Sequence, residues 1–583
     1  MSLPAQNAGE GAAPAGRAPG ESWAPALFAV VVLLGALAVG LWRLRRGADL
    51  VDEAFSVLVP WRWALGDRPF VDEQNLSQAA GLLTYPFVKL FALVTGEQVD
   101  GLVLYGRHLH LGLGILTAVA VVLLARRTLP AALALLVATP FATVVLFETP
   151  QLTANTLAAL LLAAGAALGG VTVLGGPRGY CLAAGSAFGL AGVAYPTVVL
   201  MAPFVAVLLA ASVGERGVGM LLGAEETRTR ATDASTGRRA WKAVSAWALG
   251  GALVVLPVLA LVLSLAGVDN LLRAWDYTLS VARELDQLGG AAKAVEVASA
   301  FVALLAGEWY IVVAAAVSLL VYRVRPDVGR WLLLLTPPAL WLTATTNGLH
   351  TAGAVIVYAL AAPYLYLFVP AVRRKDGARL LVWIWVPALL LGAMTAYTSA
   401  DGLERAAVGL FPGLVASGLL LAWGLQPLRL RAGGAPWPAA IGLAAVAVAF
   451  VAMQVQFQVG GAQLSDLSVR PPSGPWSGIS VTERQGAHLT SIAADLGRYA
   501  RGRDKLLAYP QGAAPYLFWP GEIAANTYQM YAADPDAPLP KAAISYYRRH
   551  GEVPTLVLRL GDARGKGRAE LVDERDRKST RLN

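Results

Sequence analysis

Apolar runs separated by short polar connections extend from about residue 25 to residue 456. Many runs approach 20 residues, which at a helical rise of about 1.5 Å per residue matches the hydrocarbon thickness of a bilayer. The pattern predicts a polytopic α-helical membrane protein with about thirteen spans. These spans are expected at residues 25–42, 102–124, 130–147, 152–172, 180–195, 197–213, 243–266, 303–322, 331–346, 352–370, 380–396, 407–425 and 437–456. Because Tyr195–Pro196 breaks the run, residues 180–213 could instead form one kinked or re-entrant element.

The polar stretch after the first apolar run carries two acidic pairs, Asp52–Glu53 and Asp72–Glu73. A charge such as Asp costs roughly 2.5 to 3.5 kcal/mol at the bilayer centre on insertion scales. Ionised pairs placed beside membrane spans therefore suggest a functional use.

The sequence from Val51 to Arg107 resembles the first extracytoplasmic loop of GT-C glycosyltransferases, in the protein-O-mannosyltransferase and aminoarabinose-transferase branch. Those enzymes carry Asp-Glu after the first span, then Gly-x-x-Pro-(Tyr or Phe)-x-Asp, and an Arg that opens the second span. The matching pieces here are Asp52–Glu53, Gly66–Asp72 and Arg107. The resemblance implies a GT-C-like fold and an inverting transfer of a sugar from a polyprenyl-phosphate donor to an extracytoplasmic lipid, glycan or protein.

The resemblance also implies roles for individual residues. Asp52 is expected to be the general base that deprotonates the acceptor hydroxyl, with Glu53 as its catalytic neighbour. Asp72 and Glu73 are expected to position substrate or coordinate a metal. The leaving phosphate needs positive charge, supplied by Arg, Lys or a divalent cation such as magnesium or manganese. Arg107, with the adjacent His108, is expected to contact the donor phosphate.

Two further positions lie on the same predicted side of the membrane. Glu148, in the hairpin between the third and fourth spans, is a further acidic candidate, and His350 could line an acceptor cleft. A clear Asp-x-Asp motif is absent around Glu148, which weakens the case for a metal, and the metal requirement is left open.

Structural alternatives stay open for each of these residues. Asp52–Glu53 could favour the N-terminus of an interfacial helix, where negative charge complements the helix dipole. Arg107 could extend its head group to the lipid phosphates, and His350 could serve a local hydrogen bond. At the level of function, the alternative is a transporter or flippase, or an inactive GT-C-like scaffold, although no convincing internal repeat is present.

Composition and charge predict a membrane location and the orientation of the chain in the membrane. The chain is 56% hydrophobic and only 15% charged, with a net charge of +9. The basic residues lie in short connections instead of one continuous patch, which argues against nucleic acid as a partner and for membrane topology. Eighteen Lys and Arg fall in the connections on the N-terminal side and four in the opposite connections after the first loop. The positive-inside rule therefore predicts a cytoplasmic N-terminus and an extracytoplasmic C-terminus, in what we expect to be a bacterial plasma membrane.

Arg43, Arg45 and Arg46 contradict this orientation locally, because they follow the first span on its outer side. They are either a misfit that the bundle tolerates or a set of guanidiniums that meets lipid phosphates.

Four segments are predicted: a disordered cytoplasmic N-terminus (1–24), the transmembrane module (25–456), a small extracytoplasmic α/β domain (457–575) and residues 576–583. The last segment, DRKSTRLN, reads as the translation of a common sequencing-library adapter. Within the third segment we expect helices at 482–499 and 540–550 and strands at 505–509 and 555–560. The outer segment 268–302 is expected to form an amphipathic helix at the membrane surface. Cys181 is the only cysteine, so no intrachain disulfide can form.

Overall fold

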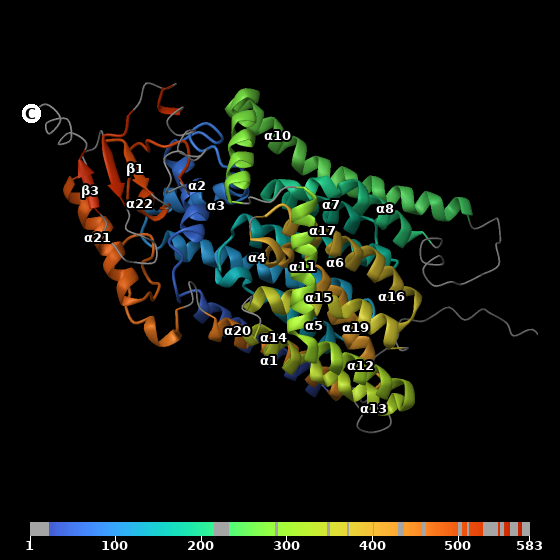
Figure 1. Ribbon diagram of the computed structural model, residues 1–583. Helices are drawn as coiled ribbons and strands as arrows, with labels where there is room; N and C mark the ends of the chain where they lie inside the picture. The colour runs from blue at the N-terminus through green and yellow to red at the C-terminus, as the bar shows by residue number, and fades with distance from the viewer. Residues whose placement is uncertain are drawn as a thin grey trace, which may run out of the picture.

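The structure is a computed structural model, mostly helical, with a small sheet at one end of a large helical bundle (Figure 1). It describes residues 23–214, 233–285, 290–346, 350–369, 372–399, 401–428, 436–457, 462–499, 504–509, 512–528, 546–548, 553–559 and 570–573. The predictions for residues 1–22, for most of the 214–242 connection, for most of the 540–550 helix and for 576–583 lie outside the described residues.

Within the described part of the chain, nine helical stretches are long and apolar enough to cross a membrane. They are α1 (Ala24–Arg43), η1 with α3 (Leu76–Thr95), α4 (Leu102–Ala125), α6 (Ala154–Val173), η3 with α8 (Pro196–Val213), Gly237–Ser280 of α10, α15 (His350–Phe368), Lys375–Tyr397 and α20 (Trp437–Gln456). A tenth is counted if Gly402–Leu410 and Gly413–Leu425, bent by 60°, form one span. Most predicted spans coincide with these helices, while the count of thirteen stays a prediction.

Three predicted spans correspond to shorter apolar helices: α5 (Ala131–Thr143), α7 (Gly179–Ala194) and the stretch Leu332–Thr346. The break at Tyr195–Pro196 is present, and the 3-10 turn η3 (Pro196–Met201) separates α7 from α8 (Ala202–Val213). Proline lacks the amide donor needed to continue α7, which explains why the helix ends there.

The sequence suggested a polar loop after the first span. The structure shows helices there instead. The stretch folds into α2 (Asp52–Leu65), the 3-10 turn η1 (Leu76–Gln78) and α3 (Ala79–Thr95). Left-handed glycines end both helices, Gly66 at φ 117° and Gly96 at φ 63°. The helices pack closely at Gly81, where an added Cβ would lie 2.8 Å from Val59 Cγ1, so a side chain there would force them apart.

The outer segment 268–302 is not one interfacial helix either. Its first half continues α10 (Asp233–Leu285) beyond a kink at Gly267, and its second half belongs to α11 (Ala291–Gly307). The predicted span 303–322 is accordingly divided between α11 and α12 (Trp309–Val324). Apolar side chains along α10 are exposed, such as Leu256 at 62%, which suits contact with lipid.

The remaining helices complete the bundle around a large apolar core. They are α13 (Pro326–Trp331), η5 (Leu332–Leu335), α14 (Thr336–Thr346), α16 (Lys375–Leu380), the π-helical turn η7 (Leu381–Trp385), α17 (Val386–Tyr397), η8 (Gly402–Arg405), α18 (Ala406–Leu410) and α19 (Gly413–Leu425). Phe141 and Phe411 meet edge to face at 5.5 Å in the core. The Ser417 hydroxyl of α19 donates to the Tyr358 carbonyl of α15 at 2.6 Å, a polar link typical of helices in membranes.

The C-terminal part contains η10 (Leu464–Asp466), α21 (Glu483–Tyr499), β1 (Leu506–Tyr509), α22 (Ala514–Leu517), β2 (Leu556–Arg559) and β3 (Glu570–Asp573). β1 pairs in parallel with β2, Leu506 opposite Leu556, and β2 pairs antiparallel with β3. The positions of α21, β1 and β2 agree with the predicted helix and strands. This part shares one apolar core with α2, since Trp476 and Tyr516 belong to the same buried cluster as Leu58. The tail therefore covers the first loop directly, at the left of Figure 1.

Candidate active site

The start of α2 is held by a reciprocal cap between Asp49 and Glu53. The Asp49 carboxylate accepts hydrogen bonds from the backbone N–H groups of Val51 (2.8 Å), Asp52 (3.2 Å) and Glu53 (3.3 Å). Glu53 Oε2 in turn accepts from the Asp49 N–H at 3.2 Å. The otherwise unpaired amides of the first helical turn are thereby satisfied. Burial, followed by the charge of Asp52, raises the pKa of Asp49 to about 7.

Glu53 forms a fully buried ion pair with Arg107, at the start of α4. Arg107 Nε donates to Glu53 Oε1 at 2.7 Å and Nη2 donates to Oε2 at 2.8 Å. The remaining donors meet the carbonyls of Leu44 (2.7 Å), Arg46 (3.1 Å) and Gly47 (2.7 Å). A guanidinium has five N–H donors, so all five are used here.

This geometry corrects two of the predicted roles. Arg107 is 0% exposed, and with its donors engaged it holds the 44–47 backbone instead of facing a donor phosphate. Glu53 is likewise 0% exposed and acts as the positioning partner of Arg107, which does not fit a catalytic contact with substrate. Asp52, one residue earlier, is exposed at the first position of α2.

Asp52 belongs to a group of charged side chains that interact electrostatically with one another, which we call the outer cluster. Its members come from four separate connections and are Asp52, Glu148, His350, Asp401, Glu404 and Arg405. Electrostatic interactions link Asp52 to Arg405 and to Glu404. His350 Nε2 lies 3.6 Å from Glu148 Oε1. The structure therefore places three of the predicted site residues, Asp52, Glu148 and His350, in one electrostatically linked group, and their roles stay a prediction.

Glu148 and His350 have strained backbones. Glu148, the last residue of η2 (Leu146–Glu148), has φ 60°, and His350 has φ 49°. Non-glycine residues rarely adopt this left-handed region, and such strain clusters at functional sites. Arg43 fixes the Glu148 turn by donating to its carbonyl at 2.8 Å. Burial raises the pKa of Glu148, against the opposing effect of His350 and Arg43.

Three members were missed as site residues by sequence reasoning: Glu404 and Arg405 in η8 (Gly402–Arg405), and Asp401 just before it. Arg405 pairs with Asp401 at 2.5 Å and lies over the Phe147 ring at 4.5 Å, and its side chain is 17% exposed. One signal was present in the sequence. Arg405 is one of few basic residues in the predicted outer connections, where the positive-inside rule disfavours them.

Asp72 and Glu73 lie outside the outer cluster. Asp72 accepts from the Arg68 N–H at 2.7 Å, which closes a local turn. Glu73 is buried and accepts from the N–H groups of Asn75 at 2.7 Å and Tyr528 at 2.5 Å. Burial raises the pKa of Glu73 to about 7, although these hydrogen bonds lower it. Both residues therefore have structural contacts, and Glu73 joins the first loop to the C-terminal part.

His108 also lies apart from the outer cluster. It is exposed on α4 and lines a pocket of about 390 Å³ that we call the basic pocket. The other lining residues are Leu41, Trp42, Arg45, Arg46 and Arg470.

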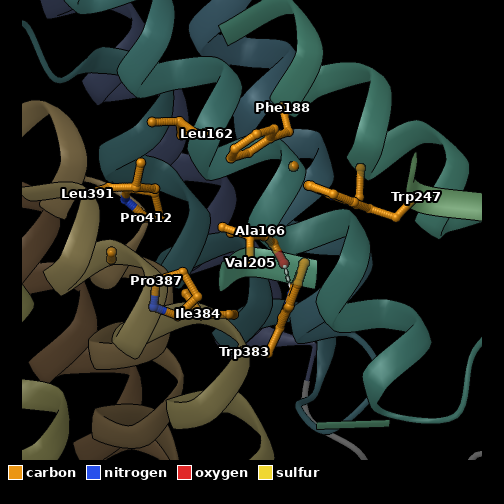
Figure 2. A pocket seen from close by; sticks show the side chains of 13 residues that line it. Leu162, Ala166, Phe188, Val205, Trp247, Trp383, Ile384, Pro387, Leu391 and Pro412 are labelled. Carbon is orange, nitrogen blue, oxygen red and sulfur yellow. Dashed lines mark hydrogen bonds between the residues drawn. The ribbon is translucent and has the colours of Figure 1, made fainter. Parts of the chain in front are cut away.

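A second cavity lies within the helical bundle, among α6, α7, α8, α10, η7 and α17 (Figure 2). Its volume is about 30 Å³ and its lining is apolar, with Trp383 Nε1 bonded to the Ala166 carbonyl at 2.8 Å. It offers no ionisable group to a reaction, so the outer cluster is the better candidate site.

Metal binding was left open by the sequence. Among the described residues, no group of three or more His, Cys, Asp or Glu side chains is arranged to hold a metal ion. Within the outer cluster, the Arg405 guanidinium supplies a permanent positive charge.

Neither a family model nor a curated protein matches the chain. Three solved structures of an oligosaccharyltransferase from Archaeoglobus fulgidus are similar, each over 92% of this chain and 70% of theirs. The protein AglB, in complex with an inhibitory peptide and a dolichol-phosphate, gives a TM-score of 0.48 at 12% identity. The form tethered to an acceptor peptide gives 0.47 at 14%, and the apo form gives 0.46 at 13%. Scores and identities this low do not establish a shared fold, so the class of this protein is argued from its own residues.

Proposed function

We propose that this protein is a membrane glycosyltransferase of the GT-C type. It transfers a sugar from a polyprenyl-phosphate donor to an acceptor hydroxyl outside the cytoplasm, with Asp52 as general base. The observation that carries the proposal is the exposed Asp52, which interacts electrostatically with Arg405 and lies at a helix start fixed by Glu53 and Arg107.

The proposed reaction uses a carboxylate and a cation on opposite sides of the bond that changes. The Asp52 carboxylate takes the proton from the acceptor hydroxyl as its oxygen bonds to the anomeric carbon. The bond from that carbon to the phosphate oxygen breaks, and its electron pair stays on the leaving phosphate. Arg405 stabilises the charge that develops there. Attack opposite the leaving group inverts the anomeric centre.

The surrounding residues support this arrangement by fixing its two charged groups. Asp401 holds the Arg405 guanidinium, and Asp49 with Glu53 holds the helix turn that carries Asp52. Such pre-organisation places the charges before substrate arrives, which lowers the cost of reaching the transition state. Glu148 and His350 border the same face, where they suit contact with the acceptor.

The Arg405 assignment is tested with purified protein in lipid nanodiscs, a labelled panel of polyprenyl-phosphate sugars and an extract of envelope acceptors. Arg405→Ala should reduce transfer strongly, and Arg405→Lys should restore only part of it, because Lys lacks the planar fork of donors. Arg498→Ala, an exposed arginine on α21, serves as the matched control and should keep full activity. Equal transfer by Arg405→Ala and wild type would contradict the role of Arg405. A folded wild-type protein that transfers no sugar but moves a labelled donor across vesicles would favour a flippase.

A further inference from the structure

The basic pocket concentrates positive charge without a matching negative charge. Three guanidiniums, of Arg45, Arg46 and Arg470, line it together with the His108 ring, and its described lining includes no Asp or Glu. In the part of the chain that the structure describes, none of the three arginines forms an ion pair with a carboxylate. Clustered guanidiniums repel one another, so a pocket of this composition favours an anion.

Contacts around the pocket fix its charged groups. The Arg46 guanidinium lies over the Trp42 ring at 5.0 Å, and Arg470 Nε donates to Ser480 Oγ at 3.1 Å. The backbone of Ser480 pairs with that of Arg45, its N–H donating to the Arg45 carbonyl at 2.8 Å. His108 Nδ1 lies 2.7 Å from the Leu104 carbonyl, which leaves Nε2 as the ring nitrogen available to a ligand. The end of the first span and the C-terminal part thus hold one cationic site between them.

The surface next to the pocket is apolar and exposed. On α1, Leu34 and Leu41 are seven residues apart, share one helix face and are 59% and 49% exposed. On α4, Ile115 lies two turns from His108 on the same face and is 39% exposed. A molecule with its anionic group in the pocket can therefore extend an acyl chain along α1 and α4.

We infer that the basic pocket binds the phosphate of an anionic membrane lipid, whose acyl chains lie along the exposed faces of α1 and α4. Arg45, Arg46 and Arg470 hold the phosphate, and the aromatic ring of Trp42 lies at the level of the head group. The pocket shares no residue with the outer cluster, so this lipid site is separate from the proposed sugar transfer. Binding of a lipid phosphate would also explain why Arg45 and Arg46 lie on the outer side of the first span, where the positive-inside rule disfavours basic residues.

The test measures lipid binding to the delipidated full-length protein by native mass spectrometry. The protein is titrated with phosphatidylglycerol, with phosphatidylcholine and with inorganic phosphate. Phosphatidylglycerol should bind about tenfold more tightly than phosphatidylcholine. The variant Arg46→Ala/Arg470→Ala should lose that preference. Because Arg107 and Arg43 donate to the backbone carbonyl of residue 46, the Arg46→Ala substitution keeps these hydrogen bonds. Arg498→Ala should bind as wild type does.

Three results would overturn the lipid site: equal binding of the two lipids, unchanged binding by the double variant, or displacement of phosphatidylglycerol by equimolar inorganic phosphate. The last result would identify a site for soluble anions. If the double variant proves unstable, Arg470→Gln alone should still weaken phosphatidylglycerol binding while leaving the thermal midpoint unchanged. Asp52→Asn should bind phosphatidylglycerol normally, so failure of the proposed transfer and failure of this site are distinguishable.

Discussion

Two adjacent acidic residues of the first loop have opposite surroundings, and their roles differ for that reason. The Glu53 carboxylate is buried and receives two hydrogen bonds from Arg107, while Asp52 is exposed and interacts electrostatically with Arg405. A buried charge is tolerated only when it is paired and fully hydrogen-bonded. Glu53 therefore contributes to the position of Asp52, and Asp52 is the residue that can meet a substrate.

Removal of one partner of the buried pair should destabilise the protein. Arg107→Met removes the ion-pair partner of the buried Glu53 carboxylate and one donor each from the Leu44, Arg46 and Gly47 carbonyls. We expect a loss of about 3 to 5 kcal/mol in the free energy of unfolding. Thermal unfolding in detergent measures this loss as a lower midpoint. Arg498→Ala, at an exposed position, should change the midpoint little. A midpoint for Arg107→Met equal to that of wild type would show that the pair does not hold the loop.

The sequence predicts the acidic motif, but it does not predict that Glu53 is buried against Arg107 while Asp52 is exposed. The Asp-Glu pair and Arg107 are visible as a pattern, yet the partners of Arg107 include the carbonyls of Leu44, Arg46 and Gly47. Backbone carbonyls have no signature in sequence, and their direction depends on how the chain turns after α1. The same limit applies to Arg405, which approaches Asp52 only because separate helices pack together.

At the scale of elements, residues 62–78 of the first loop dock onto residues 519–528 of the C-terminal part. Arg62 pairs with Asp67 at 2.9 Å and donates to the Trp519 carbonyl at 3.1 Å. The Tyr528 hydroxyl donates to Asp67 at 2.6 Å, and its N–H donates to the buried Glu73. The sequence predicts the tail elements from their own patterns, but these contacts join positions more than 400 residues apart along the chain.

The Glu73 carboxyl should make this docking dependent on pH. Its pKa rises from an ordinary value of 4.5 to about 7 in the folded protein, chiefly through burial. Protonated Glu73 therefore favours the folded state, and its contribution is complete below about pH 4.5 and lost as the pH rises to about 7. The loss amounts to as much as about 3 kcal/mol.

The measurement compares the thermal midpoints of wild type and Glu73→Gln between about pH 4.5 and pH 8. Asp49 titrates in the same range, so the difference between the two curves isolates Glu73. Glu73→Gln should show a smaller decline with rising pH, whereas Glu97→Gln, at an exposed position, should decline as wild type does. Parallel curves for wild type and Glu73→Gln would contradict the pH dependence assigned to this carboxyl.

At the scale of the whole molecule, separate connections converge on one face of the bundle to form the outer cluster. The predicted spans place Glu148, His350 and Arg405 on the same side of the membrane as Asp52, which stays a prediction. In the structure, a Glu148–His350 ion pair and electrostatic interactions of Asp52 with Glu404 and Arg405 link these connections. Span positions follow from hydropathy, which is a local property. The helices that run from residue 233 to residue 324 differ more from prediction, because the kink at Gly267 and the junction of α11 and α12 leave no hydropathy signal.

The orientation is testable by cysteine labelling. In a Cys181→Ser background, single cysteines at Ser235 and Ser473 should be accessible from opposite sides, Ser235 from the cytoplasm and Ser473 from outside. A membrane-impermeant maleimide applied before and after permeabilisation measures this. Ser473 is exposed, so its labelling is not limited by burial. Labelling of both sites from the same side would reject the predicted topology.

The central claim is that Asp52 is the general base of sugar transfer. Asp52→Asn preserves the shape of the side chain but removes its capacity to take a proton, so we expect transfer to fall by roughly 10²- to 10⁴-fold. Its thermal midpoint should match that of wild type, and Asp466→Asn, at an exposed position outside the outer cluster, should keep full activity. The decisive measurement is the initial rate of labelled sugar transfer by Asp52→Asn and wild type in the same nanodiscs. A large loss of rate with unchanged donor binding is the predicted result, and full activity of Asp52→Asn would contradict the account.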